Sequence, residues 1–209
     1  MKTEIIVVGA GGHAKVCIES LRAMGESIAF CVGASDSPPE CAGVPVLRGD
    51  ENLSRLRAEG YSRLFVAIGS NQLRERLAIL CLEQGYNLVN AISPHAVISK
   101  SVVLGRGVAV MAGVVINADT VIEDLAIINT AATVDHDCRV GQAAHVAPQS
   151  ALAGNVSIGN LSFLGIGCKV IPDIRIAERA TVGAGGVVVC NIESDAIVVG
   201  VPAKPVNSK

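Results

Sequence analysis

The chain has 209 residues, of which 50% are apolar and 17% charged, a length that allows one or two domains with a sizeable core. Its 17 Lys and Arg nearly balance 19 Asp and Glu, which excludes the basic stripe of a dedicated nucleic-acid-binding protein. The sequence contains no apolar run of about 18 residues and does not begin like a signal peptide, so we expect a cytoplasmic protein without membrane insertion.

The first predicted element is a short buried strand from Glu4 to Val8, which runs directly into the sequence GAGGHA. A helix is predicted from Lys15 to Met24. Gly9, Gly11 and Ala14 match the dinucleotide fingerprint G-x-G-x-x-G/A, in which glycines let the backbone approach a phosphate at a helix N-terminus. This strand, glycine turn and helix predict a phosphate-binding site.

The second predicted strand, Ile28 to Val32, argues against NAD as the ligand. An NAD site needs an acidic residue at the end of this strand, and here the first acid is Asp36, which lies in a loop. A nucleotide diphosphate needs the same glycine turn but does not need that acidic residue. A nucleotide-linked substrate is therefore favoured over NAD.

The rest of the first domain alternates predicted strands and helices. They are a strand at Gly43 to Leu47, a helix at Glu51 to Glu59, a strand at Arg63 to Ile68, a helix opened by Gly69 and a strand at Leu88 to Ile92. This alternation predicts a small Rossmann-like α/β domain with a parallel sheet over residues 1–92. Ser93-Pro94 marks the start of the second domain, residues 93–209.

Every sixth residue of the second domain, over a long stretch, is isoleucine, leucine or valine. The positions are Ile98, Leu104, Val110, Ile116, Ile122, Ile128, Val134, Val140, Val146, Leu152, Ile158, Leu164, Val170, Ile176, Val182 and Val188. On an α-helix a step of six residues would spread these side chains over three faces. On strands six is an even number, so all of them face the same side.

The residues two places earlier share this orientation and are mostly small, as at Ala126, Ala132 and Ala144. A narrow interior with one branched and one small residue per hexad predicts stacked short strands in a parallel β-helix. Cys138 and Cys168 occupy the same small inward positions. Because the seven cysteines form no CxxC pair, we expect reduced thiols.

The stretch from Ile128 to Gly159 contains residues suited to acid–base chemistry. His136 and Asp137 fall on the two corner positions of their hexad, outside the predicted coil. A histidine accepts a proton near neutral pH, and a neighbouring carboxylate orients its ring. The pair could deprotonate an amine or hydroxyl nucleophile; alternatively, His136 is a solvated surface histidine.

A metal site is the competing chemical interpretation, because the chain has four histidines and Asp135 lies beside His136. The sequence contains no HExxH motif and no histidine pair at helical spacing, and His13 belongs to the other domain. We therefore expect no metal.

Six segments, GAGGHA, VAIGSNQLR, VDHDCRVG, AHVAPQSALAGNVSIG, FLGIG and VGVPAKP, together resemble a known family. These are the bacterial sugar acyltransferases with left-handed β-helix hexapeptide repeats, in which three hexads form one triangular coil and three chains form a trimer. The chain is most similar to enzymes that acetylate UDP-linked 4-amino-4,6-dideoxy sugars. GDP-perosamine N-acetyltransferases and sialic acid O-acetyltransferases are relatives.

The resemblance implies roles for individual residues. His136 matches the general base and Asp137 its acidic partner. The implied acetyl-CoA contacts are His145, the backbone of Gly154, Gly165, Ile166, Gly183 and Lys204. The implied nucleotide-sugar contacts are Gly9, Gly11, Gly12, His13, Asn71 and Arg74, with Asp36 where relatives often have paired aspartates.

In an 18-residue coil, Gly154 stacks above His136, where its N–H could stabilise a thioester oxyanion or the glycine could simply form a corner. His145 follows His136 by half a coil, on the opposite face. At about 3.3 Å per residue a face spans about 15 Å, so both histidines can act on one acetyl group only across a subunit interface. A homotrimer with inter-subunit active sites is therefore expected.

The function implied is an acetyl-CoA-dependent N-acetyltransferase acting on the 4-amino group of a nucleotide-linked sugar, with UDP as the first expectation. GDP-perosamine N-acetylation and sialic acid O-acetylation are the enzymatic alternatives. A non-enzymatic β-helix scaffold is the third interpretation, because the fold alone does not establish an enzyme.

Overall fold

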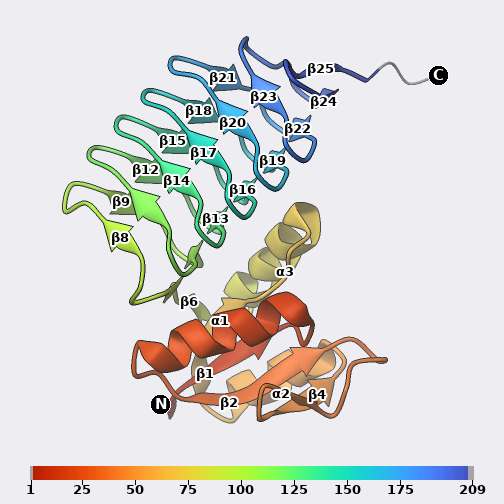
Figure 1. Cartoon of the computed structure of the whole chain (residues 1–209). Helices are drawn as coiled ribbons and strands as arrows, with labels where there is room; N and C mark the ends of the chain where they lie inside the picture. The colour runs from red at the N-terminus through yellow and green to blue at the C-terminus, as the bar shows by residue number, and fades with distance from the viewer. Residues whose placement is uncertain (1, 207–209) are drawn as a thin grey trace. The chain divides into compact units, whose positions relative to one another are not determined.

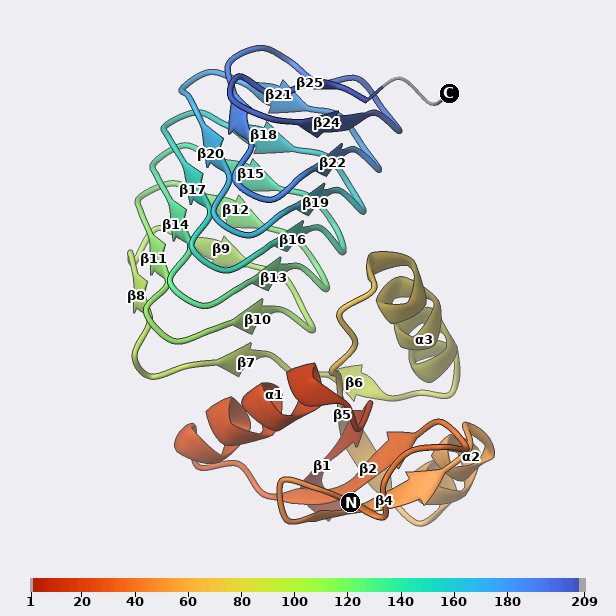
Figure 2. The same ribbon diagram turned by 45° about the vertical axis from the view of Figure 1, so that its right-hand side comes forward.

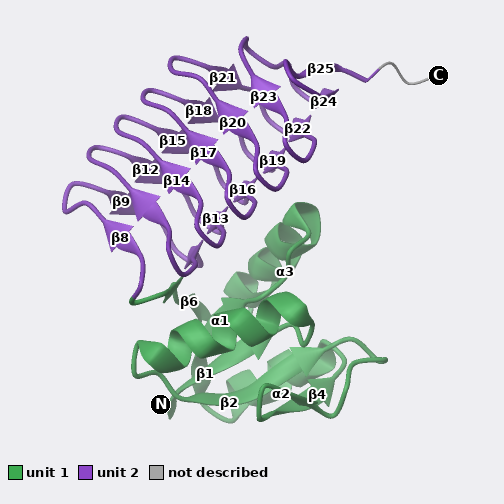
Figure 3. Cartoon of the chain, viewed as in Figure 1, with its two compact units in different colours: residues 1–94 green, residues 95–209 purple. Residues whose placement is uncertain are grey.

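The computed structural model describes residues 2–206 and contains two compact units, residues 1–94 and 95–209 (Figure 3). Unit 1 is an α/β domain and unit 2 is built from short strands (Figure 1). No helix in the described part of the chain is long and apolar enough to cross a membrane. The cysteines at all seven positions are free, and six of them are buried.

Unit 1 contains a six-stranded sheet in the order β3-β4-β2-β1-β5-β6. Its elements are β1 (Lys2–Val8), α1 (Gly12–Ala23), β2 (Ile28–Gly33), β3 (Glu40–Cys41), β4 (Val44–Arg48), α2 (Glu51–Ala58), β5 (Tyr61–Val66), α3 (Asn71–Glu83) and β6 (Asn87–Leu88), followed by β7 (Ala91–Ile92). All pairs in this sheet are parallel except β3 with β4. The chain order reverses between β1 and β5, and ligands of such sheets bind at the carboxyl ends of the strands near this point.

Strand β1 forms the centre of unit 1. Ile5, Ile6 and Val7 have no exposed surface, as expected for a parallel strand covered on both faces. Helix α1 begins at Gly12, earlier than the predicted Lys15, because the extended Gly11 is its N-cap and the first turn follows immediately. This places the start of α1 directly after the glycine turn.

Unit 2 is a parallel β-helix with three sheets, one for each face of the coil (Figure 2). One sheet contains β7, β10 (Ala109–Val110), β13 (Ile127–Ile128), β16 (His145–Val146), β19 (Phe163–Leu164), β22 (Thr181–Val182), β24 (Ile197–Val199) and β25 (Lys204–Pro205). The second contains β8 (Val97–Ile98), β11 (Val115–Ile116), β14 (Thr133–Val134), β17 (Ala151–Leu152), β20 (Lys169–Val170) and β23 (Val187–Val188). The third contains β9 (Val103–Leu104), β12 (Val121–Ile122), β15 (Arg139–Val140), β18 (Ser157–Ile158) and β21 (Arg175–Ile176).

From β8 to β23 each strand pairs with the strand 18 residues away, so residue 109 lies beside 127 and residue 127 beside 145, whereas β24 pairs in parallel with β22 at a spacing of 16 residues and antiparallel with β25. Eighteen residues therefore complete one circuit. The branched residues of the hexad point inward, and Val134, Val140 and Val146 have no exposed surface. The small residues Ala132 and Ala144 are equally buried and fill the narrow interior beside them.

The corners of unit 2 share a left-handed backbone conformation at their second residue. Its φ is 58° at Asp119, Asp137 and Asn155, and 60° at Gln149. Asparagine and aspartate tolerate this region better than most non-glycine residues. The same turn therefore recurs every hexad and presents two adjacent side chains outside the coil.

Candidate functional site

His136 and Asp137 form the corner between β14 and β15, and both side chains are about 60% exposed. The Nδ1 atom of His136 lies 2.8 Å from Oδ2 of Asp137. This contact fixes the orientation of the imidazole and leaves Nε2 as the ring nitrogen that faces away from the carboxylate. The geometry suits a proton acceptor held by an acidic partner.

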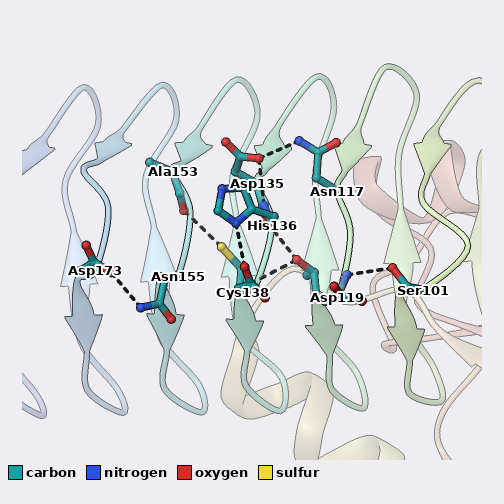
Figure 4. Close-up of polar contacts among 11 residues, drawn as sticks. Ser101, Asn117, Asp119, Asp135, His136, Cys138, Ala153, Asn155 and Asp173 are labelled. Atoms are coloured by element: carbon teal, nitrogen blue, oxygen red, sulfur yellow. Dashed lines mark hydrogen bonds and ion pairs between the residues drawn. The ribbon is translucent and has the colours of Figure 1, made fainter.

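A second carboxylate, that of Asp135, supports the same corner (Figure 4). Its Oδ1 accepts a hydrogen bond of 2.8 Å from the backbone N–H of His136 and another of 2.8 Å from the side-chain amide of Asn117 on the preceding coil. The Asn117 amide, followed by the His136 N–H, lowers the pKa of Asp135. The sequence analysis missed Asn117, although its spacing of one coil from Asp135 could have identified the contact.

The pKa of His136 is raised above its ordinary value. The largest cause is the hydrogen bond to Asp137, and the next is the negative charge of Asp135. Both carboxylates favour the imidazolium form, so the corner stabilises the proton that a general base would take up.

Gly154 lies one coil above His136, and its backbone is covered by the imidazole. A Cβ on residue 154 would lie 2.6 Å from Cε1 and 2.8 Å from Nε2 of His136, so only glycine leaves room for the ring. The N–H of Gly154 donates to no partner within residues 2–206, whereas the equivalent N–H of His136 bonds to Asp135. The difference arises because Ala153 precedes Gly154 where Asp135 precedes His136, and it leaves a donor beside the base.

His145 lies on β16, in the face of the coil opposite the His136 corner, and is only 9% exposed. Its Nε2 is 3.0 Å from the side-chain amide of Asn129, and its ring packs edge-on against Phe163 at 5.3 Å. Within a single chain the structure does not bring His145 and His136 together.

The other residues with implied acetyl-CoA contacts lie on the same side as His145. The N–H of Gly165 bonds to Val182 and its carbonyl accepts from Ser150, so the backbone of Gly165 is already engaged. Ile166, 52% exposed, keeps an N–H that donates to nothing in the described structure. Gly154 and Ile166 therefore each present a backbone N–H that has no partner within residues 2–206.

Gly183 and Lys204 lie near the end of the coil. The N–H of Gly183 bonds to Val198 of β24, so it is engaged in the ladder. Lys204 lies in β25, opposite Val199 of β24, and is exposed. Its ammonium group is therefore accessible from this end of unit 2.

The predicted nucleotide-sugar residues of unit 1 fall into two groups. Gly9, with φ 117°, lies so close to the next strand that a Cβ would be 2.7 Å from the carbonyl oxygen of Ala67. Gly11 and Gly12, by contrast, have open space where a Cβ would lie. The backbone of this turn is thus accessible to a phosphate.

His13, Asn71 and Arg74 form the second group, which is largely buried. The Arg74 guanidinium, 1% exposed, donates to the carbonyl oxygens of Ile68 and Gly69 and to Oδ1 of Asn71. Burial, and then the charge of Arg74, lowers the pKa of His13 to about 4, so His13 is neutral at pH 7. Arg74 therefore supports the loop before α3 from inside the unit.

A cavity of about 400 Å³ lies at the carboxyl ends of β1, β2, β4 and β5. Gly9, Gly33 and Ile68 line it, together with the charged residues Asp50 and Arg76, which the sequence analysis missed. Asp36 is exposed in the loop after β2 and does not line it. Asp50 follows a predicted strand and precedes a predicted helix, a position that could have identified it.

A further hollow of the surface contains none of the predicted residues. This hollow of about 700 Å³ on the face of β15, β18 and β21 is lined by residues such as Arg139 and Arg175. It is larger than the cavity of unit 1, and although β15 directly follows the His136 corner, neither His136 nor Asp137 lines it. Within the described residues, no group of three or more His, Cys, Asp or Glu side chains could hold a metal ion.

The comparison with protein families matches residues 4–79 to the PglD N-terminal domain. Among solved structures, PerB from Caulobacter crescentus in complex with CoA and GDP-perosamine is 56% identical, with a TM-score of 0.95, covering 98% of this chain and 97% of that chain. The acetyltransferase domain of PglB from Neisseria gonorrhoeae, in complex with acetyl coenzyme A, is 36% identical with a TM-score of 0.91, covering 99% and 100%.

Among curated proteins, a dTDP-4-amino-4,6-dideoxy-D-glucose acyltransferase from Escherichia coli is 39% identical over 57 residues, 27% of this chain. The chain spans 30% of the length of that relative. The predicted fold class, an α/β domain followed by a left-handed parallel β-helix, is confirmed, as are acetyl-CoA and an acyltransferase activity. The chain belongs to the bacterial sugar acyltransferases with a PglD N-terminal domain and a hexapeptide-repeat β-helix, and it is a CoA-dependent sugar N-acetyltransferase.

Proposed function

We propose that the protein transfers an acetyl group from acetyl-CoA to the amino group of a GDP-linked 4-amino-4,6-dideoxy sugar, with GDP-perosamine as the best-supported acceptor. The observation behind this proposal is the 56% identity, over nearly the whole chain, to a protein crystallised with CoA and GDP-perosamine. The sequence-based expectation named UDP first and GDP-perosamine as an alternative. The alternative is better supported, and the loop CVGASDS lacks the paired aspartates of many relatives.

The chemistry we propose is direct transfer at the His136 corner. The neutral amine of the sugar attacks the thioester carbonyl carbon while Nε2 of His136 accepts a proton from the nitrogen. The open N–H of Gly154 donates to the developing oxyanion, an interaction of about 3 kcal/mol in comparable sites. As the carbon–sulfur bond breaks, His136 returns the proton to the CoA thiolate. Asp137 holds the imidazole throughout.

We further propose a homotrimer in which each active site lies between two chains. His136 and Gly154 occupy one corner of the coil, whereas His145 and Ile166 belong to the opposite face and a different corner. One acetyl-CoA molecule can contact both groups only if the corner of one chain meets its neighbour. A three-fold arrangement would repeat this contact three times.

Free thiol release from acetyl-CoA tests the acceptor. The panel contains GDP-perosamine, the UDP- and dTDP-linked 4-amino-4,6-dideoxy sugars and free sialic acid. We expect the highest kcat/KM with GDP-perosamine. Preference for UDP would restore the first sequence-based expectation, and turnover of sialic acid alone would make the enzyme an O-acetyltransferase.

A further inference from the structure

The cavity of unit 1 contains an acidic side chain with no structural task. Asp50 occupies the N-cap position of α2, yet its side chain makes no capping hydrogen bond. Within the described part of the chain its carboxylate accepts no hydrogen bond and forms no ion pair, although it lines the cavity. A carboxylate at the mouth of a ligand pocket and free of internal partners is available to a ligand.

The position of Asp50 in the sheet determines which part of the ligand it can meet. The glycine turn after β1 is the phosphate-binding element, and Asp50 follows β4, beyond β2 in the sheet order. A nucleotide with its diphosphate at Gly11 and Gly12 would extend its nucleoside across the ends of β1 and β2. The base would then lie toward β4, next to Asp50.

Guanine matches this carboxylate better than the pyrimidines do. Its edge presents two adjacent donors, N1–H and the 2-amino group, which a carboxylate can accept together. On uracil or thymine the single edge donor, N3–H, lies between two carbonyl oxygens that a carboxylate repels. We propose that Asp50 recognises guanine and is the residue that selects a GDP-linked over a UDP-linked substrate, an inference that rests on the proposed function.

Asp36 provides a matched comparison for Asp50. It was the only acid that the sequence analysis assigned to the nucleotide. It lies in the exposed loop after β2 and is absent from the cavity lining, whereas Ala34 and Ser35 of the same loop are present. Relatives often have paired aspartates at the end of the second strand. In this chain we assign their role, contact with the nucleotide, to Asp50 at the start of α2.

Inosine nucleotides test the inference because they lack only the 2-amino group of guanine. Calorimetry would measure the binding of GDP and IDP to the wild-type protein and to Asp50→Ala, Asp50→Asn and Asp36→Ala. We expect the wild type to bind GDP about 10- to 100-fold more tightly than IDP, the range for a hydrogen bond to a charged group. Asp50→Ala should bring this ratio close to one, Asp50→Asn should give an intermediate ratio, and Asp36→Ala should keep the wild-type ratio.

A wild-type ratio in Asp50→Ala, with the thermal unfolding temperature unchanged, would overturn the inference. An Asp36→Ala ratio near one would also overturn it, by assigning recognition to the loop after β2. These binding results are independent of acetyl transfer. Failure of the proposed function would appear instead as a wild-type enzyme that binds GDP with an Asp50-dependent preference but does not acetylate GDP-perosamine.

Discussion

The imidazole of His136 lies directly against the backbone of Gly154, one coil further along the chain, with no space between them for a methyl group. The base and the open N–H of Gly154 are therefore held side by side by the coil itself. Two hexads could not provide this pairing, because only the 18-residue repeat returns the chain to the same corner.

Replacing Gly154 by alanine should displace the His136 ring without unfolding the coil. The added Cβ would lie 2.6 Å from Cε1 of a largely exposed side chain, which can rotate away. We expect kcat to fall by about 10²-fold, as for the loss of a positioned proton acceptor, with little change in thermal stability. Steady-state kinetics would measure the loss. In a His136→Ala background, Gly154→Ala should cost much less, and full additivity would contradict the steric argument.

Removal of the base itself should affect the chemical step. We expect His136→Ala to lower kcat by about 10²- to 10⁴-fold while acetyl-CoA affinity stays nearly unchanged, because a proton acceptor is lost rather than a binding contact. Asp137→Asn should cost less, since it orients the ring and does not accept the proton. Weakened acetyl-CoA binding with a normal kcat in His136→Ala would instead assign His136 to the cofactor site.

The pH dependence of activity should report the two carboxylates beside His136. The base must be neutral, so kcat/KM should fall as pH drops through the raised pKa of His136. Asp135→Asn removes a negative charge, lowers this pKa and should move the acidic limb of the profile to lower pH. Asparagine can still accept the His136 N–H, so the geometry is retained. Asp173→Asn, two coils further along the same edge of the β-helix, serves as the control and should leave the limb unchanged.

We expect a substitution of Arg74 to lower the free energy of unfolding of unit 1, because Arg74 has a structural role in this unit. Arg74→Met leaves the carbonyl oxygens of Ile68 and Gly69 without their donor, and each unsatisfied buried group costs about 1–3 kcal/mol of the free energy of unfolding. Chemical denaturation would measure the loss. Arg76→Met, at an exposed position on the same helix, should change stability by less than about 0.5 kcal/mol. Normal stability with lost nucleotide binding would make Arg74 a substrate contact.

Mixing inactive subunits tests the shared active site. His136→Ala and His145→Ala chains, unfolded together or allowed to exchange, should recover part of the activity, because some interfaces would again combine both histidines. Mass spectrometry of differently tagged chains would prove exchange. Full activity of His145→Ala alone, or no recovery despite proven mixed trimers, would rule out a site that uses both histidines across an interface.

Much of the fold was predictable because each hexad repeats one local rule. The inward residues Val134 and Val140 were identified by periodicity alone, and both are fully buried. Ile98 and Leu104 obey the same periodicity but are only partly buried, because the first coil has a neighbouring coil on one side only. A pattern in sequence fixes the direction of a side chain and not the number of its neighbours.

The site was less predictable because its contacts depend on separate turns of the chain. His136 and Asp137 are adjacent in sequence, so their pairing could be predicted. Asn117 reaches Asp135 across one full coil, and the cavity of unit 1 gathers the ends of four strands. The sequence analysis therefore gave Asp50 no role, because its place in the cavity depends on the neighbouring strands.

The 18-residue pairing of the strands from β8 to β23 also limits how this domain can change in length. Losing or gaining one residue inside the stack would turn the following inward side chains outward, and a change of six would move them to another face. Only a whole circuit restores both the inward column and the alignment of each corner with the one below it. Evolution can therefore lengthen or shorten the stack in steps of one coil, and a circuit inserted between His136 and Gly154 would separate the base from its oxyanion donor while leaving the fold intact.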